Sequence, residues 1–403
     1  MTSLRAVHGP ATAVVPWLRA TWAAGDAALV LPEHGTTTQI RDLLRRLRPA
    51  TLTSFAPSPG PAGPIPLAGP APPPETVSDL PEPLPTADDV RLVVATSGST
   101  GEPKGVELTA SALEASTRAG LARLGAHTGQ RWALPLPLHH VAGIAVVRRA
   151  WALHTDPVLV PSRAALGEVA AQHLALVPTQ LTRALDDGVD LARFATVLLG
   201  GAAAPDRLLE RARDAGARVV VSYGMSETAG GCVYDGVPLD DVAVEVAADG
   251  RIRIAGAVCF RGYRGDPDAT AAALDDDWLV TCDLGRWRNG RLEVLGRVDE
   301  VAVSGGENVG LPAVASAVRG HPDVADAEVT SRPDPEWGEA VVAVVVVRDG
   351  RAPPSLGELG DHVAAQLPAS HRPRAVTVVD ALPRDELGKV PRAALAALAA
   401  DAR

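Results

Sequence analysis

The segment Thr96-Ser-Gly-Ser-Thr-Gly-Glu-Pro-Lys-Gly105 directly follows an apolar run, Arg91 to Thr96, that is typical of a buried β-strand. The segment contains three glycines, four hydroxyl side chains and one lysine. Backbone N–H groups, hydroxyl donors and an ammonium can together surround phosphate oxygens. It is not a Walker A loop, because Pro103 stands where that motif requires its second glycine. A flexible polar turn would explain the glycines and serines but not their fixed order with the lysine. We therefore expect a phosphate-binding loop with contacts from Thr96, Ser97, Gly98, Ser99, Thr100, Gly101 and Lys104.

The rest of the chain alternates between apolar β-rich runs and amphipathic stretches. Such alternation is typical of layered α/β subdomains with largely parallel strands. Strands are predicted at residues 91–96, 173–177, 194–199 and 218–222, and helices at 111–124, 178–185 and 205–215. Between residues 244 and 294 the pattern changes to short strands and turns, which predicts a small β subdomain. Beyond Gly296, helices near 312–318 and 356–367 and strands near 327–331, 340–347 and 374–379 predict a compact α+β domain.

The chain of 403 residues exceeds what one hydrophobic core usually serves, which favours one large and one small domain. We expect an N-terminal domain at residues 1–297 and a mobile C-terminal domain at residues 298–403. The segment 54–85 is crowded with proline, so it is predicted to be an extended surface connection rather than a helix or a central strand. It would separate a short N-terminal helical subregion from the main fold.

Charge and composition exclude several classes of partner. A net charge of −10 provides no basic face for nucleic acid or anionic lipid. The first thirty residues contain no apolar run long enough for a signal peptide or a membrane span, so we expect a cytoplasmic protein. The three cysteines, Cys232, Cys259 and Cys282, lack metal-ligand spacing and are predicted to be reduced thiols.

Lysine is scarce in this chain. Of 38 basic residues only Lys104 and Lys389 are lysine. The two either reflect a biased genome or mark places where a compact ammonium is needed and a planar guanidinium does not fit. Both lie inside motifs, which favours the second interpretation.

Further segments follow the loop in a fixed order: Gly200-Gly-Ala-Ala203, Ser222-Tyr-Gly-Met-Ser-Glu-Thr228, Thr281-Cys-Asp-Leu-Gly285, Gly296-Arg-Val-Asp-Glu300 and Pro383-Arg-Asp-Glu-Leu-Gly-Lys-Val-Pro-Arg392. With the loop, they resemble the signatures of the adenylate-forming superfamily, which includes acyl-CoA synthetases, adenylation domains and luciferases. The resemblance runs from about Val90 to the C-terminus. It implies an enzyme that uses ATP and Mg²⁺ to convert a carboxylic acid into its acyl-AMP, and then passes the acyl group to coenzyme A.

The resemblance implies how the large domain would hold the nucleotide. Its central motif contains Tyr223, which can stack on the adenine, Thr228, which can donate to phosphate, and Glu227, which can hold Mg²⁺. The other nucleotide contacts would come from Gly200, Gly201 and Ala202 beside the adenine, and from Ser222, Gly224 and Met225.

Roles near the domain boundary and in the small domain are implied in the same way. Asp283 would accept hydrogen bonds from the two ribose hydroxyls. Arg297 would lie near the ribose or phosphate, and Asp299 would be the hinge. Lys389 resembles the adenylation lysine, whose ammonium stabilises the charge that builds up between the attacking carboxylate and the α-phosphate.

The acid itself is indicated by the segment Leu134-Pro-Leu-Pro-Leu-His-His-Val-Ala-Gly143, which resembles the family's acyl-pocket motif with His140 at the gating position. Gly224 would also border the acid. Arg148 lies two turns after Val141 in a predicted helix and can bind a second carboxylate of the substrate. This pattern resembles the o-succinylbenzoate–CoA ligases of menaquinone biosynthesis. The alternative is that Arg148 and Arg149 lie on a solvated helix face.

Three other functions remain open from the sequence. They are a CoA ligase for another aryl or medium-chain acid, a stand-alone adenylation enzyme that loads a carrier protein, and a nucleotide-binding relative without catalysis. Retention of Glu227, Asp283 and Lys389 together argues against the last. The expected partners are the small-molecule acid, ATP and CoA, without nucleic acid or membrane, and the sequence allows a homodimer.

Overall fold

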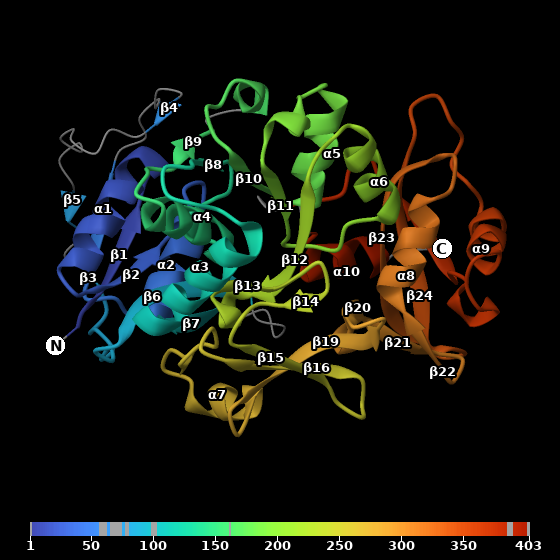
Figure 1. The fold of residues 1–403 in the computed structure, drawn as a ribbon. Helices are drawn as coiled ribbons and strands as arrows, with labels where there is room; N and C mark the ends of the chain where they lie inside the picture. Colours follow the sequence, from blue (N-terminus) through green and yellow to red (C-terminus); the bar gives the residue numbers. More distant parts are fainter. Residues whose placement is uncertain are drawn as a thin grey trace. The chain divides into compact units, whose positions relative to one another are not determined.

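A computed structural model describes residues 2–55, 63–64, 75–76, 80–97, 103–160, 163–384 and 390–400. The chain divides into two compact units. The larger consists of Met1–Glu245 with Arg253–Val280, and the smaller of Val246–Ile252 with Thr281–Arg403. Each unit is mixed α/β, which confirms the predicted fold class (Figure 1).

A mixed seven-stranded sheet contains the strand that precedes the phosphate loop. Its order is β17–β7–β6–β2–β1–β3–β5. Strand β1 pairs in parallel with β2 and β3, and β2 with β6, whereas the β6–β7 and β7–β17 pairs are antiparallel. The bounds are Leu4–His8 for β1, Ala27–Val30 for β2, Thr51–Ser54 for β3, Glu75–Thr76 for β5, Val90–Ser97 for β6, Pro103–Thr109 for β7 and Gly262–Tyr263 for β17.

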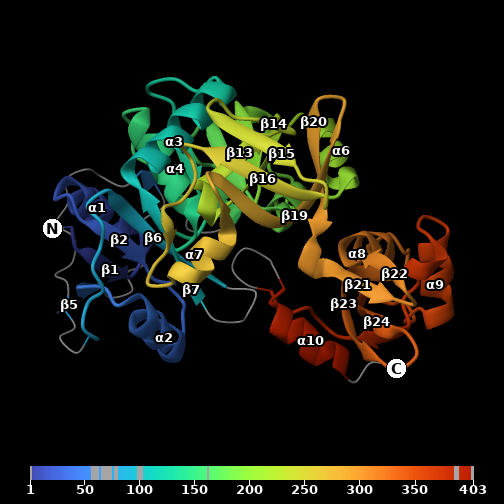
Figure 2. The same cartoon turned by 90° about the horizontal axis from the view of Figure 1, so that it is seen from below.

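The predicted short helical subregion at the N-terminus is wrong. Helices α1 (Ala11–Ala23) and α2 (Thr37–Leu47) alternate with β1, β2 and β3, so this region forms part of the seven-stranded sheet. The strands are only four or five residues long, and β2 is buried on both faces, so it lacks the apolar–polar alternation that reveals a half-exposed strand. Helix α2 packs its leucines on the sheet face that carries Leu4, Ala6 and Leu29, with α1 beyond the other face (Figure 2).

A second sheet, of eight strands, carries the nucleotide motif. Its order is β14–β13–β12–β11–β10–β8–β9–β4, and the run from β9 to β12 is parallel. Helices α5 (Pro178–Asp186) and α6 (Asp206–Asp214) contribute to its core. The strands predicted at 173–177, 194–199 and 218–222 are confirmed. The bounds are Gly63–Pro64 for β4, Trp132–Leu134 for β8, Val158–Leu159 for β9, His173–Leu176 for β10, Thr196–Leu199 for β11, Val219–Met225 for β12, Gly230–Tyr234 for β13 and Val237–Pro238 for β14.

Two helices connect these sheets. Helix α3 (Ala110–Leu124) contacts β6 and β7 of the first sheet, and α4 (Val141–Ala152) contacts β8 of the second. They also contact each other, and both touch β13 (Figure 1). Thr109 accepts a hydrogen bond from the backbone N–H of Ala112 and thereby caps the start of α3. Gly125 ends α3 in the left-handed conformation, with φ of 63°.

The region from residue 242 to 297 forms the predicted β-rich segment. Its sheet has the order β15–β16–β19–β18, with β20 paired to β19, and the division between the two units passes through β16 and β19. The bounds are Val242–Val246 for β15, Arg251–Gly256 for β16, Leu274–Asp275 for β18, Trp278–Arg288 for β19 and Arg291–Arg297 for β20, with helix α7 at Pro267–Ala273. The predicted domain boundary between residues 297 and 298 marks the point about which the C-terminal domain would move, and it stays a prediction.

The smaller unit continues with a sheet of order β22–β21–β24–β23, in which β25 pairs in parallel with β24. The apolar run 340–347 lies within β24, and Val341 to Val345 are fully buried there, as predicted. The bounds are Val301–Ser304 for β21, Glu307–Gly310 for β22, Leu311–Arg319 for α8, Val324–Asp334 for β23, Gly338–Val347 for β24, Leu356–Ala364 for α9, Ala375–Val378 for β25 and Arg392–Ala400 for α10.

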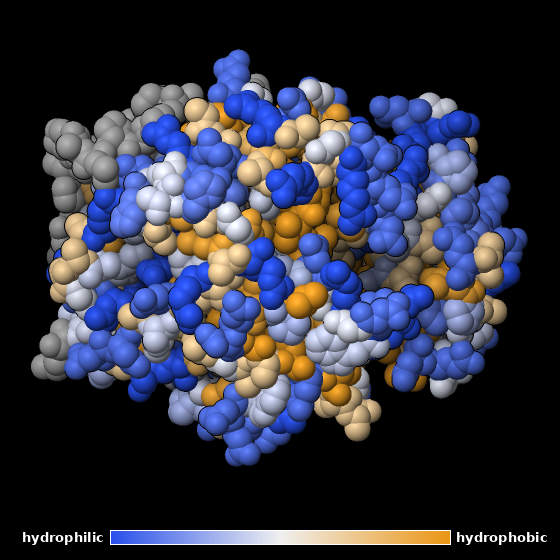
Figure 3. Space-filling model, in the orientation of Figure 1, coloured by the Kyte–Doolittle hydropathy of each residue, from blue (hydrophilic) through white to orange (hydrophobic). Residues whose placement is uncertain are grey.

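Hydrophilic residues predominate over the face drawn in Figure 3, and hydrophobic residues gather mainly towards its middle. Within the described ranges, no helix combines the length and the apolar character that a membrane span requires.

Arg264, which directly follows β17, joins distant parts of the larger unit. Its guanidinium donates to the backbone oxygens of Leu47, Leu84 and Pro85, and at 3.0 Å to the Glu107 carboxylate. Only 1% of the Arg264 side chain is exposed. Burial lowers the pKa of Arg264, and the hydrogen bond and charge of Glu107 oppose that change. A buried cation with this many acceptors is a structural anchor.

We expect Arg264→Met to lower the free energy of unfolding by about 3–5 kcal/mol, because the half-buried Glu107 carboxylate and three backbone oxygens would lose their donor. Urea unfolding of the variant, followed by circular dichroism, measures the change. The matched control is Arg261→Met, whose exposed pair with Asp89 should contribute no more than about 1 kcal/mol. Equal effects of the two substitutions would show that Arg264 is not an anchor.

Candidate active site

The phosphate loop is carried by a β-hairpin. In the β6–β7 pair Thr96 lies opposite Lys104, and Ser97 lies opposite Pro103. The Thr96 hydroxyl donates to the backbone oxygen of Lys104 at 3.5 Å. The tip of the hairpin, with Gly98, Ser99, Thr100 and Gly101, lies outside the described residues. The strand before the loop, β6, is the one predicted at residues 91–96, whereas β7 after the loop was not predicted.

Lys104 lies beside a tyrosine rather than beside an acid. Its Nζ is 4.6 Å from the centre of the Tyr263 ring, and no described carboxylate forms an ion pair with it. The Tyr263 hydroxyl donates to Oε1 of Glu227 at 2.9 Å. Lysine, tyrosine and glutamate come from β7, β17 and the short helix η3 (Ser226–Thr228). The fold thus brings together two predicted site residues around a third that was not predicted.

The nucleotide motif forms the turn between β12 and β13. Thr228 is fully buried, and its hydroxyl accepts from the backbone N–H of Met225 and donates to the oxygen of Gly230 at 2.7 Å. In this state the hydroxyl fixes the turn, and the predicted contact with phosphate remains a prediction. Gly224 has no room for a side chain, because a Cβ there would lie 2.1 Å from the Gly230 oxygen. Tyr223 and Ser222 precede it in β12.

The turn predicted to border the adenine follows β11. The backbone N–H of Gly200 donates to the backbone oxygen of Leu176, at the end of the parallel neighbour β10, at 3.1 Å, and this bond positions Gly200. A Cβ on Gly200 would lie 3.3 Å from the Ser222 oxygen, so this turn and β12 approach closely. Gly201 has a φ of 83°, which favours glycine, and Ala202 follows it on the surface.

The smaller unit contains the predicted ribose residues. Asp283 on β19 lies opposite Arg297 on β20, and a guanidinium nitrogen of Arg297 donates to Oδ1 of Asp283 at 3.1 Å. Asp283 is buried, and its N–H donates to the Thr281 hydroxyl at 3.0 Å. Asp299 lies in the short helix η4 (Val298–Glu300). Lys389 lies outside the described residues.

Two arginines of α4 face the interior of the larger unit, so the alternative of a solvated helix face is wrong. Arg149 is only 3% exposed, donates to the Tyr234 hydroxyl at 2.9 Å and lies over the Trp132 ring. Arg148 is half-buried. His140 precedes α4 as its N-cap residue, with its ring 4.1 Å from that of His139.

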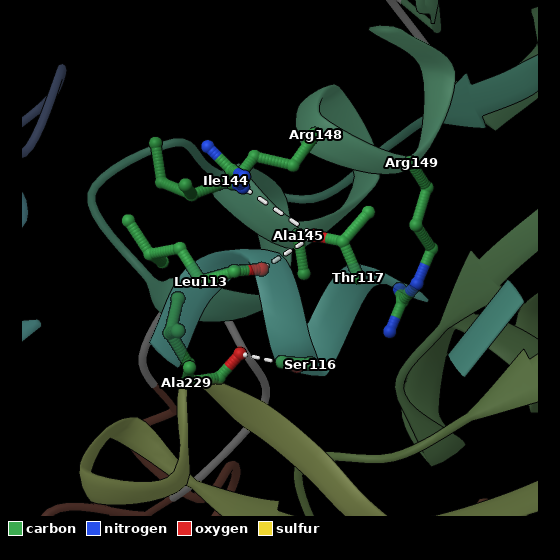
Figure 4. A pocket seen from close by; sticks show the side chains of 9 residues that line it. Leu113, Ser116, Thr117, Ile144, Ala145, Arg148, Arg149 and Ala229 are labelled. Atoms are coloured by element: carbon green, nitrogen blue, oxygen red, sulfur yellow. Dashed lines mark hydrogen bonds between the residues drawn. The ribbon is translucent and has the colours of Figure 1, made fainter. Parts of the chain in front are cut away.

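Arg148 borders a small cavity between α3 and α4 (Figure 4). Its Nε donates to the Thr117 hydroxyl at 3.3 Å, and its guanidinium lies 5.4 Å from the Trp22 ring centre. Burial lowers the pKa of Arg148, whereas the charge of Glu114 raises it. The cavity volume is about 10 Å³, which is the space of one water molecule. A single carboxylate oxygen would fit there, and the rest of an acid would lie outside it.

The sequence did not reveal Tyr263 or Thr117 as site residues. Thr117 lies on an ordinary helix face, and only the fold brings it to Arg148. Tyr263 did carry a signal. It is one of only three tyrosines in the chain, and the other two, Tyr223 and Tyr234, lie in the β12–β13 hairpin that carries the nucleotide motif. Tyrosine, like lysine, is scarce in this chain and occurs at or beside the signature segments.

Comparison with known proteins identifies the family of this chain. Residues 13–263 match the family described as AMP-binding enzyme, and residues 313–389 match the AMP-binding enzyme C-terminal domain. The chain belongs to the AMP-binding enzyme family. It is an adenylate-forming enzyme, as the signature segments predicted.

Three known proteins show how this chain relates to the family. A probable 2-succinylbenzoate–CoA ligase of Mycobacterium tuberculosis is 44% identical, over 76% of this chain and 84% of the relative. A feruloyl-CoA synthase of an Amycolatopsis species is 32% identical, over 93% of this chain and 80% of the relative. The solved structure of o-succinylbenzoate CoA synthetase from Bacillus subtilis in complex with its acyl-adenylate intermediate has a TM-score of 0.83 and 26% identity, and the match covers 98% of this chain and 88% of that one.

Proposed function

We propose that this adenylate-forming enzyme is an AMP-forming ligase that joins 2-succinylbenzoate to coenzyme A, a step of menaquinone biosynthesis. The proposal is supported by the 44% identical relative and by the shared fold of the synthetase that holds an acyl-adenylate. The observation that carries the choice of acid is Arg148. This half-buried cation borders a cavity the size of a carboxylate oxygen, and a substrate with two carboxylates can use it.

The reaction would proceed in two halves. A carboxylate oxygen of the acid attacks the α-phosphorus of ATP, and pyrophosphate leaves. The CoA thiol then attacks the acyl carbonyl carbon, and AMP leaves. Lys104 would contact the phosphates, Tyr223 the adenine, and Asp283 and Arg297 the ribose side. Lys389 would lie at the transferring centre in the first half-reaction and be withdrawn in the second by rotation about Asp299.

Glu227 fits the role of the residue that holds Mg²⁺. Its half-buried carboxylate receives one hydrogen bond, from Tyr263 at Oε1, and no other described residue donates to Oε2. A hard cation prefers such an oxygen. When bound, Mg²⁺ would neutralise the charge of the phosphates. The cytoplasmic location and the homodimer stay predictions from the sequence.

A panel of acids tests this function directly. We expect AMP release, dependent on both acid and CoA, with 2-succinylbenzoate. Weaker release is expected with 4-oxo-4-phenylbutyrate, which lacks the ring carboxylate, and with ferulate and octanoate. Mass spectrometry of the thioester identifies the product. Preference for ferulate or octanoate would overturn the proposed acid, and AMP release without CoA consumption would indicate a different acceptor.

Arg148→Ala should lower kcat/KM for 2-succinylbenzoate about 10- to 100-fold, because a charge-assisted hydrogen bond contributes about 1.5–3 kcal/mol. The KM for ATP should change little. The control is Arg118→Ala on α3, where the exposed side chain pairs with Asp241 at the surface. If Arg148→Ala raises the two KM values equally, Arg148 does not bind the acid.

Lys389→Ala should abolish acyl-AMP formation and retain thioester formation from acyl-adenylate supplied to the enzyme. Pyrophosphate release measures the first half-reaction, and consumption of the CoA thiol measures the second. Arg348→Ala, which removes an exposed cation of the smaller unit, serves as the control. Loss of both half-reactions with the fold intact would contradict the proposed division between them.

A further inference from the structure

We propose that Tyr263 is a positioning residue for Mg²⁺–ATP: its hydroxyl orients the Glu227 carboxylate and its ring holds the Lys104 ammonium. The inference rests on the proposed function, because it needs ATP as a substrate. One side chain would thus fix the relative positions of Lys104 and Glu227, which belong to two signature segments more than a hundred residues apart in the chain.

The position of Tyr263 is fixed from several sides. Strand β17 pairs with β7, with Tyr263 opposite Val106. The backbone N–H of Tyr263 donates to the Thr270 hydroxyl at 2.8 Å, and its ring meets the Phe260 ring edge to face at 5.0 Å. The next residue, Arg264, donates from its backbone N–H to the oxygen of Gly105 at 2.8 Å. These contacts limit the movement of the Tyr263 ring. The ring can therefore orient Lys104 and Glu227, which contact it.

Glu227 is held by hydrogen bonds to both its side chain and its backbone. Its side-chain Oε1 accepts from the Tyr263 hydroxyl at 2.9 Å, and its backbone oxygen accepts from the N–H of Phe260 at 2.8 Å. A donor on Oε1 limits rotation of the carboxylate and leaves Oε2 for a cation. Partners of this kind typically change metal affinity by about 10- to 100-fold.

The ring supports Lys104 without neutralising it. A carboxylate partner would hold the ammonium but would also cancel its charge and compete with phosphate. The face of an aromatic ring attracts a cation by about 0.5–2 kcal/mol and leaves its hydrogen-bond donors free to turn to another acceptor. The 4.6 Å distance between Nζ and the ring centre fits this interaction. Lys104 is thus held close to its place before the phosphates arrive.

Two substitutions separate the two tasks. Tyr263→Phe keeps the ring beneath Lys104 and removes the hydroxyl, whereas Tyr263→Leu removes both. Calorimetric titration with the non-hydrolysable analogue α,β-methylene-ATP, at a series of Mg²⁺ concentrations, gives nucleotide affinity without turnover. The control is Tyr234→Phe, which also loses a hydrogen-bonded phenol hydroxyl in the same unit, the one bound by Arg149.

For Tyr263→Phe we expect the Mg²⁺ concentration that half-saturates nucleotide binding to rise about tenfold, with unchanged affinity in the absence of Mg²⁺. Tyr263→Leu should in addition weaken binding without Mg²⁺, because Lys104 loses its support. Tyr234→Phe should leave the Mg²⁺ requirement unchanged. An unchanged Mg²⁺ requirement in Tyr263→Phe, or an equal loss with and without Mg²⁺, would overturn the inference.

Different results would overturn the proposed function and the proposed role of Tyr263. If the wild-type protein binds the analogue with Mg²⁺ but forms no AMP from 2-succinylbenzoate, the proposed acid is wrong and the Phe variant still decides the role of Tyr263. If nucleotide binding to the wild-type protein does not depend on Mg²⁺, Glu227 does not hold the cation and the inference is overturned.

Discussion

The buried guanidinium of Arg264 is the interaction on which the arrangement of the site depends. It reaches the end of α2, the segment before β6 and the Glu107 carboxylate on β7, so it holds β17 at the edge of the seven-stranded sheet. Gly105 makes this approach feasible, since a Cβ there would lie 3.2 Å from the Arg264 Cβ and 2.5 Å from a Leu47 methyl group. The neighbouring residue, Tyr263, is thereby placed between Lys104 and Glu227.

The proposed acid side and the nucleotide side are connected by the same short segment of chain. Ser116 on α3 donates from its hydroxyl to the backbone oxygen of Ala229, which directly follows Thr228. Arg149 on α4 donates to the Tyr234 hydroxyl at the other end of β13. The two helices that border the small cavity are therefore anchored to the strand that follows the nucleotide motif (Figure 4).

Much of this could be predicted because the evidence is local. The strand before the phosphate loop, the helix 111–124 and the buried run 340–347 follow from short-range apolar patterns, which act within a few residues. The N-terminal strands could not be recognised, because they are only four or five residues long and β2, which is buried along its whole length, lacks alternation. Tyr263, Thr117 and Arg264 act through partners far away in the chain, such as Glu227 for Tyr263 and Leu47 for Arg264. Only the tertiary fold specifies such contacts.

The central claim is that the acid is activated as its adenylate, and oxygen transfer tests it most directly. The enzyme would be given 2-succinylbenzoate with heavy oxygen in its carboxylates, together with ATP, Mg²⁺ and CoA, and the products would be weighed by mass spectrometry. The account predicts that each AMP released carries one heavy oxygen from the acid, because the carboxylate oxygen that attacks the α-phosphorus stays with AMP when the thiol displaces it. Unlabelled AMP, or label found in inorganic phosphate alongside ADP, would contradict it.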